Sequence, residues 1–144
     1  MNSQPKMRQR AYVHLGGHDP LIGLPVHAAI KRAALRFPHN EAVVSVPQGK
    51  RLTYERFFAE VEKLAAGLMG MGVEKGDRVG IWATDNVEWV ALQIATARVG
   101  AVLVNINPAY RTGELRHALK SARINVMFLM PAFLANSNTF RLAP

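Results

Sequence analysis

The sequence predicts an α/β fold built on a parallel β-sheet. Its 144 residues are 49% hydrophobic and 19% charged, a composition that suits one globular domain and excludes a disordered chain. From residue 78 to residue 130, the hydrophobic pattern alternates strand, helix, strand, helix, strand. Because parallel strands need a crossover between them, this alternation predicts parallel strands with right-handed connections. A helix and a small hairpin are expected before this unit.

The first predicted element is a helix over residues 24–37, which Pro38 ends. Its apolar positions recur at helical spacing and predict a buried stripe of Val26, Ala29, Ile30, Ala33, Ala34 and Phe37. Residues 41–46 and 51–53 are then expected to form a hairpin, because the segment between them has the composition of a turn.

A long helix is predicted to follow over residues 54–71, with Thr53 as its N-cap and Gly72 at its end. Apolar residues on one side predict a buried stripe of Phe57, Val61, Leu64, Ala65, Leu68 and Met71. The glycines from Gly70 to Gly76 loosely resemble a phosphate loop. However, they end a helix and lead into a strand, which is the reverse of the order that phosphate binding needs.

The alternating unit contains three strands and two helices. The strands are expected at residues 78–83, 101–106 and 124–130. Asp85 or Asn86 caps a helix that runs to residue 98 and is closed by Gly100, and Thr112 caps another that runs to residue 122. The nearly continuous apolar strands predict a sheet that is covered on both faces. Trp82 and Trp89 are assigned packing roles.

Charge and residue usage exclude several functions. The net charge of +8 is spread unevenly, with +5 in residues 1–40, −1 in residues 41–114 and +4 in residues 115–144. A nucleic-acid-binding domain is disfavoured because no basic stripe has interleaved aromatic residues. The chain has no cysteine, which excludes disulfides, thiolate metal sites and thiol catalysis. No apolar run is long enough for a transmembrane helix, and no complete catalytic motif or metal site is recognised.

Three motifs in a fixed order carry a resemblance to a known family. They read RLTYERFFAEVEKLAAGL at residues 51–68, GVEKGDRVGIWATDNVEWV at residues 72–90 and QIATARVGAVLVNINPAYRTGEL at residues 93–115. In these motifs the chain resembles the beginning of an acyl-CoA synthetase of the adenylate-forming, AMP-binding superfamily. The segment VNINPAYR is most similar to the corresponding sequence of the medium-chain fatty acyl-CoA synthetase branch.

The resemblance implies a two-step ligation. A carboxylate is joined to AMP from ATP with release of pyrophosphate, and the acyl group then passes to coenzyme A (CoA). It also implies that the chain is an incomplete α/β subdomain, the N-terminal part of the adenylate-forming ligase fold. We divide it into an N-terminal arm (residues 1–23), the AMP-binding part (residues 24–130) and an unmatched tail (residues 131–144).

Few functional residues are implied within this chain. The loop that matches Asn107, Pro108 and Ala109 lies near the CoA entrance in relatives, although Pro108 alone also explains a strand-to-helix loop. The groups that hold ATP and Mg²⁺ lie downstream in the family, and no catalytic residue or metal ligand is assigned. We therefore expect the chain alone to be inactive, with none of ATP, Mg²⁺ and CoA binding productively to it.

Partners and location follow from the same resemblance. Fatty acid and CoA are the substrates implied for the full-length enzyme, and no nucleic acid is expected. The location implied is the cytoplasm, at the membrane periphery, or the mitochondrion in a eukaryote. An incomplete sheet would leave an edge open to self-association. The alternative is a non-catalytic α/β module that binds a partner protein through the same surface.

Overall fold

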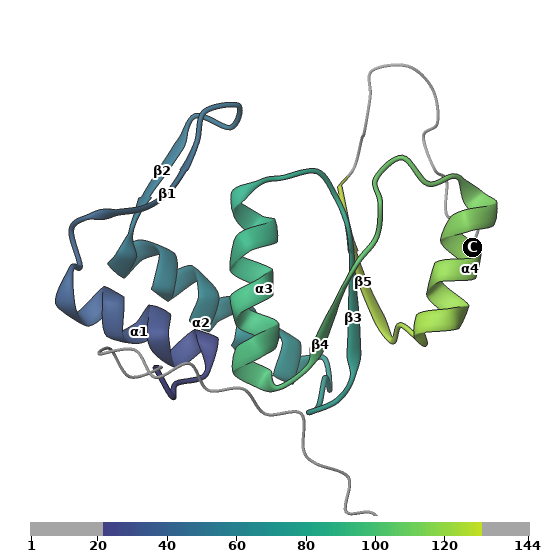
Figure 1. Ribbon diagram of the computed structural model, residues 1–144, viewed down its shortest axis with the longest axis horizontal. Helices are drawn as coiled ribbons and strands as arrows, with labels where there is room; N and C mark the ends of the chain where they lie inside the picture. The colour runs from purple at the N-terminus through teal and green to yellow at the C-terminus, as the bar shows by residue number, and fades with distance from the viewer. Residues whose placement is uncertain (1–21, 131–144) are drawn as a thin grey trace, which may run out of the picture.

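The computed structural model describes residues 22–130 (Figure 1). The predicted arm, apart from its last two residues, and the predicted tail lie outside the described residues. Within residues 22–130 the chain forms four helices and five strands. In order these are α1 (Val26–Arg36), β1 (Glu41–Ser45), β2 (Lys50–Thr53), α2 (Tyr54–Gly70), β3 (Arg78–Trp82), α3 (Val87–Val99), β4 (Val102–Asn105), α4 (Thr112–Ala122) and β5 (Val126–Leu129).

The parallel sheet confirms the predicted fold class. Its strand order is β4-β3-β5, and β3 pairs in parallel with both neighbours. The chain leaves β3, crosses through α3 to β4, and returns through α4 to the other side of β3. Right-handed crossovers in opposite directions place α3 and α4 on opposite faces of the sheet (Figure 1). The hairpin of β1 and β2 forms a separate antiparallel pair.

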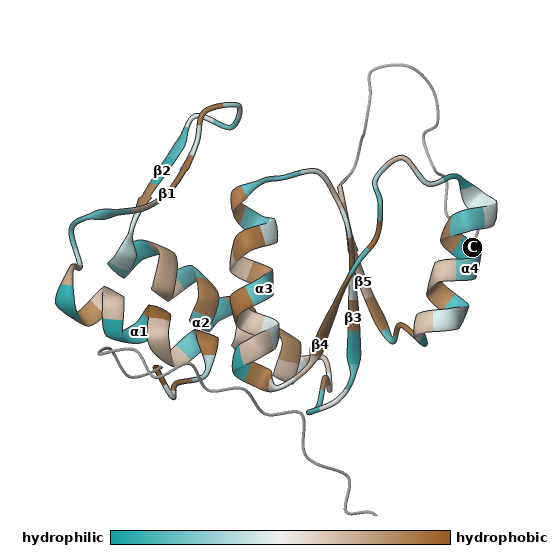
Figure 2. Cartoon of the chain, viewed as in Figure 1, coloured by the Kyte–Doolittle hydropathy of each residue, from teal (hydrophilic) through white to brown (hydrophobic). Residues whose placement is uncertain are grey.

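The main core lies between the sheet and the helices α2 and α3. Phe57, Val61, Ala65 and Leu68 from α2 are all buried there, as the predicted stripe requires. α3 contributes buried residues on several sides, because it lies between α2 and the sheet and also contacts α1. Figure 2 shows that hydrophobic residues (brown) occur along α2, α3 and the strands of the sheet.

The face of the sheet toward α4 is more open than predicted. Leu115 is the buried residue of α4, and Ile106, which follows β4, is also buried. Val102 and Leu129, on the two outer strands, are 50% and 46% exposed. The apolar strands predict cover on both faces, but α4 is short and amphipathic and covers only part of this face.

The ends of the predicted apolar stripes are exposed. Val26 is 57% exposed, Phe37 is 45% exposed and Met71 is 56% exposed. Val26 begins α1, whereas Phe37 and Met71 are the C-caps of α1 and α2. At these positions the chain enters or leaves the helix, and the side chain no longer follows the helical periodicity that predicts burial.

Most predicted caps are confirmed. The Thr53 side chain accepts a hydrogen bond from the Arg56 amide, and Asn86, of the two candidates, accepts one from the Trp89 amide. Gly100 adopts the left-handed conformation that ends α3, with φ of 86°. The prediction for Thr112 is wrong, because Thr112 is the first helical residue of α4 and the N-cap is Arg111.

No helix within residues 22–130 is both long and apolar enough to cross a bilayer.

The backbone at residues 70–76 forms a helix end and a turn, as predicted, and not a phosphate loop. Gly72 has φ of 81° and Gly76 has φ of 92°, and the Val73 amide donates to the Leu68 carbonyl. The glycines therefore cap α2 and turn the chain toward β3, as the sequence analysis preferred.

Candidate functional site

The candidate site is the carboxyl edge of the parallel sheet, where β3, β4 and β5 end. In open α/β sheets, ligands bind outside the carboxyl ends of strands, where the connections of neighbouring strands diverge to opposite faces. Here the diverging connections are α3 and α4. Three segments meet at this edge: residues 83–86 after β3, residues 106–111 after β4, and Met130 after β5.

Asn107 organises the loop after β4. Its side-chain Oδ1 accepts a hydrogen bond from the Ala109 amide at 2.9 Å, and its carbonyl oxygen accepts one from the Tyr110 amide at 3.0 Å. Both bonds close the loop on Asn107, an arrangement typical of an Asx turn. Asn107 and Ala109 are exposed and Pro108 is half-buried, so the three predicted residues form one compact loop at the edge.

A side-chain bond from β3 ties this loop to the sheet. The indole Nε1 of Trp82, the last residue of β3, donates to the Asn107 carbonyl oxygen at 3.0 Å. Trp82 was predicted to have a packing role, and this contact was not predicted. Sequence alone gave no signal for it, because the bond joins residues 25 positions apart.

The loop after β3 is joined to the end of β5. The Thr84 amide and hydroxyl donate to Met130 Sδ at 3.3 and 3.1 Å. The Met130 amide in turn donates to the Trp82 carbonyl oxygen at 3.2 Å. Residues Trp82 and Thr84 therefore connect the central strand to the loops on both sides, and the edge forms one hydrogen-bonded unit.

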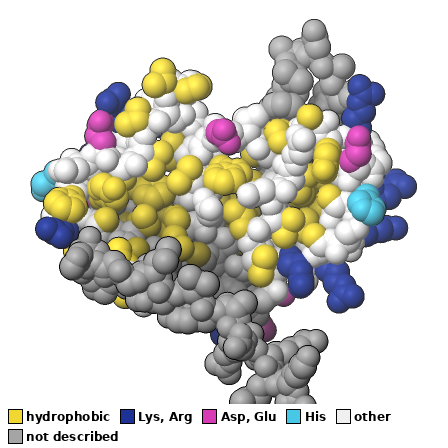
Figure 3. All heavy atoms as spheres, viewed as in Figure 1, with side chains coloured by type: hydrophobic (Ala, Val, Ile, Leu, Met, Phe, Trp, Pro, Cys, Tyr) yellow, Lys and Arg dark blue, Asp and Glu magenta, His cyan; other side chains and the backbone are white. Residues whose placement is uncertain are grey.

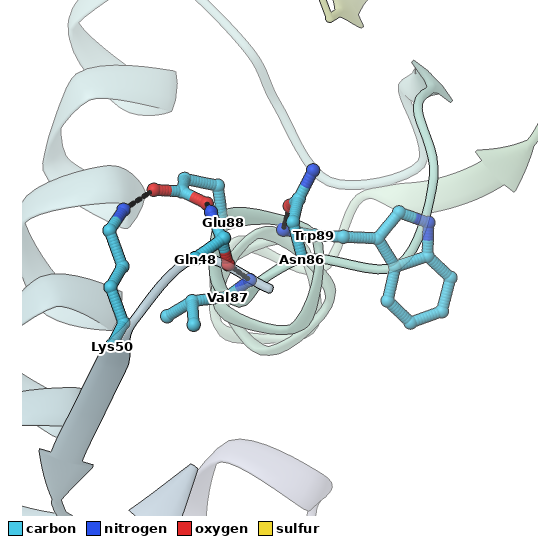
Figure 4. A network of polar contacts seen from close by, with 6 residues as sticks. All are labelled: Gln48, Lys50, Asn86, Val87, Glu88 and Trp89. Carbon is cyan, nitrogen blue, oxygen red and sulfur yellow. Dashed lines mark hydrogen bonds and ion pairs between the residues drawn. The ribbon is translucent and has the colours of Figure 1, made fainter. Parts of the chain in front are cut away.

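The N-terminus of α3, beside this edge, is closed by the hairpin (Figure 4). Gln48, in the hairpin turn, accepts a hydrogen bond from the Val87 amide at 2.8 Å and donates one to Glu88 at 2.7 Å. Lys50 forms an ion pair with the same carboxylate. The hydrogen bonds from Lys50 and Gln48 lower the pKa of Glu88 to about 2.

These contacts do not fit a site for ATP phosphates or Mg²⁺. The first amides of α3 are occupied by Gln48 and Asn86, so they are not free to hold a phosphate. Within residues 22–130, no group of three or more His, Asp or Glu residues is placed to hold a metal ion. The carboxyl edge instead offers an exposed, braced loop.

A shallow open hollow lies next to the loop, on the surface of α4. It has a volume of about 530 Å³ and is lined by Tyr110, Gly113, Glu114, His117 and Ala118. Figure 3 shows Lys and Arg side chains along the outer side of this region and hydrophobic side chains between it and the sheet. Tyr110 belongs both to the hollow and to the hydrogen-bonded loop, so the two features are continuous.

Known proteins are similar to this chain in sequence and in fold. A comparison with protein families matches residues 30–142 to the AMP-binding enzyme family, a range that continues past residue 130. The chain is 40% identical over 117 residues to the medium-chain acyl-CoA ligase ACSF2, mitochondrial, of Danio rerio. It is 38% identical over 117 residues to the putative acyl-CoA synthetase YngI of Bacillus subtilis. Each match covers 81% of this chain but only 19% and 21% of the relative.

Solved structures agree with the sequence matches. The N-terminal domain of FACL13 from Mycobacterium tuberculosis has a TM-score of 0.71 at 28% identity, over 73% of this chain and 26% of that chain. A putative long-chain-fatty-acid CoA ligase from Rhodopseudomonas palustris has a TM-score of 0.69 at 31% identity, over 74% of this chain and 26% of that chain. The chain thus spans about a fifth of the length of its curated relatives, and it belongs to the AMP-binding enzyme family.

Proposed function

We propose that this chain forms the N-terminal part of an ATP-dependent fatty acid–CoA ligase. In the first step, a carboxylate oxygen bonds to the α-phosphorus of ATP and pyrophosphate leaves. In the second step, the thiol sulfur of CoA bonds to the acyl carbon and AMP leaves. The observation that carries the proposal is the 40% identity to a medium-chain acyl-CoA ligase over 81% of this chain.

Within that enzyme we assign Asn107, Pro108 and Ala109 to the approach of CoA. Two features support the assignment: the loop is exposed at the carboxyl edge of the sheet, and it continues into the hollow beside Tyr110. ATP and Mg²⁺ are assigned to parts of the enzyme outside residues 22–130, because the described residues offer no fitting donor set. No step is therefore derived through either group here.

The chain alone is expected to be inactive. Fatty-acid-dependent exchange of labelled pyrophosphate into ATP reports the first step without CoA, and octanoic acid is a suitable medium-chain probe. We expect the 144-residue chain to give the same exchange as a blank without fatty acid. Exchange above that blank would overturn the proposal that further segments are required.

A graft tests the ligase assignment itself. This chain replaces the matching segment of the Danio rerio ligase, which is 40% identical to it. The graft is expected to catalyse octanoate-dependent exchange and to form octanoyl-CoA. The same ligase with the segment deleted is the control and is expected to be inert. A graft that melts cooperatively but forms neither product would contradict the assignment.

One observation favours a second candidate, a non-catalytic module that associates with itself or with another protein. The outer strands expose Val102 and Leu129 beside unpaired strand edges within the described residues.

We place either form in the cytoplasm, at the membrane periphery, or in the mitochondrion, the compartment named for the ACSF2 relatives. Fractionation of cells that express the tagged protein distinguishes these locations.

A further inference from the structure

One side chain holds the exposed loop after β4 against the sheet. The Trp82 indole donates to the Asn107 carbonyl oxygen at 3.0 Å, and the same oxygen accepts the Tyr110 amide at 3.0 Å. The Asn107 side chain accepts the Ala109 amide at 2.9 Å. The last two bonds lie within the loop and fix its shape. The Trp82 bond holds the loop against β3, together with the bond from the Ile106 amide to the Ile81 carbonyl oxygen at 2.9 Å.

Trp82 is well placed for this task. It ends the central strand, pairs with Leu129 in the register of β3 and β5, and accepts the Met130 amide at its carbonyl oxygen. Its backbone position is therefore set from inside the sheet. The large planar indole has few rotatable bonds and carries a single donor. Its hydrogen bond therefore holds the exposed residue Asn107 at a fixed place relative to β3.

We propose that Trp82 is a positioning residue for the CoA-dependent step, acting through Asn107 on the loop of residues 107–110. The identity of the ligand rests on the proposed function, whereas the brace itself rests on the contact between Trp82 and Asn107. Loss of the indole donor leaves the loop tied to β3 through the bond from the Ile106 amide to the Ile81 carbonyl oxygen. The two bonds that close the loop on Asn107 then open more often, and the loop moves away from the sheet more often. Binding of CoA at the loop then becomes weaker, while acyl-adenylate formation keeps its rate.

Hydrogen exchange in the 144-residue chain tests the brace without any ligand. We expect the Trp82 indole proton to exchange more slowly than that of free indole. In Trp82→Phe, which keeps an aromatic ring but removes the donor, the Ala109 and Tyr110 amides should exchange about fivefold faster, as loss of one hydrogen bond predicts. An indole proton that exchanges at the free rate, or unchanged amide exchange in the variant, would overturn the brace.

Trp89→Phe is the matched control. It makes the same chemical change in α3, where Trp89 packs against the main core and its amide is bound to Asn86. Exchange at Ala109 and Tyr110 should stay unchanged in this variant. Equal acceleration in both variants would mean a general loosening of the fold and would also overturn the specific role of Trp82.

The ligase graft separates the two steps. Trp82→Phe is expected to raise the KM for CoA about fivefold and to leave octanoate-dependent pyrophosphate exchange unchanged. A fall in pyrophosphate exchange with an unchanged KM for CoA would contradict the role in the second step. If the unaltered graft melts cooperatively but catalyses neither step, the proposed function fails, and the hydrogen-exchange result still decides the brace.

Discussion

A single carboxylate connects the hairpin to α3. Glu88 accepts hydrogen bonds from Gln48 and Lys50, which lie 40 and 38 residues away in the sequence. The Glu88 side chain is 58% exposed, so solvent screens the attraction and its contribution stays near that of a surface ion pair. The structural value of Glu88 lies in joining two units that are far apart in the chain.

The lowered pKa of Glu88 predicts how stability changes with pH. Its folded pKa of about 2 lies below the ordinary value of 4.5, so its stabilisation is complete above pH 4.5 and is lost as pH falls toward 2. Glu88→Gln should therefore lower the free energy of unfolding by about 0.5–1 kcal/mol at pH 7. The difference from the unaltered chain should shrink at pH 3. Urea unfolding at both values measures it.

Glu74→Gln provides the control for this experiment. Glu74 is exposed and forms no ion pair among the described residues. Its removal should change the free energy of unfolding by a similar small amount at both pH values. A loss that is the same at pH 7 and pH 3 for Glu88→Gln would contradict the assignment of the low pKa to the hairpin contacts.

Residue-scale predictions succeeded where the cause is local. Thr53 and Gly100 were identified because a cap depends on the residue itself and its neighbours within one helical turn. Arg111 was missed as the N-cap of α4 because its side chain is no usual cap. The helix start is held instead by the Glu114 side chain, which accepts the Arg111 amide at 2.7 Å.

At the scale of elements, the segment between α4 and β5 packs closely on the central strand at Gly80. A Cβ atom added to Gly80 would lie 3.0 Å from Cγ2 of Ile124 and 3.5 Å from Cδ1 of Ile106. Gly80→Ala should lower the free energy of unfolding by about 1–3 kcal/mol, because these side chains must move in a packed region. Thermal unfolding followed by circular dichroism measures the change.

A glycine-to-alanine change on a helix surface should act in the opposite direction. Gly67 lies within α2 and is exposed, and a Cβ atom there would meet no atom within 4 Å. Gly67→Ala should raise the free energy of unfolding by about 1 kcal/mol through helix propensity. Destabilisation of the same size in both variants would show that the contact with Ile124 is not the cause.

The elements themselves were largely predictable. All nine were found in order, with bounds that shift by no more than two residues, because their apolar periodicity is strong. The antiparallel pairing of the hairpin and the parallel alternation also followed from local pattern and connection length. Exposure at the helix ends and at β4 was not predicted, because it depends on how far each neighbouring element extends.

For the molecule as a whole, the two outer strands determine how the chain behaves in solution. β4 and β5 each pair with β3 on one side only within the described residues, and each exposes an apolar side chain. We predict that the 144-residue chain associates with increasing concentration and melts over a broad range. Sedimentation velocity over a concentration series tests this, and a monomer with a sharp melt would contradict it.

Val102→Lys tests whether the edge of β4 is responsible for the association. A lysine on an edge strand opposes pairing with another chain because its charge must stay hydrated. The variant should sediment as a smaller species than the unaltered chain at equal concentration. Lys75→Arg, which keeps the charge of an exposed residue outside the strands, should behave like the unaltered chain. Equal association of all three proteins would exclude the β4 edge.

The candidate site was predictable only in part. Asn107, Pro108 and Ala109 were proposed through resemblance, and in the structure they form one loop at the carboxyl edge. Trp82, Thr84 and Met130 could not be identified with them, because their contacts arise only when β3 pairs with both neighbours. Their role in CoA binding is the proposal that Trp82→Phe in the graft tests.

The strand order β4-β3-β5 has a consequence for synthesis on the ribosome. The central strand, β3, is translated first, and its two partners follow in turn along the chain. After β4 has docked, β3 still presents its other edge until α4 and β5 have emerged, at about 5–20 residues per second. During that interval a nascent chain offers the edge of its most buried strand to chaperones or to neighbouring chains.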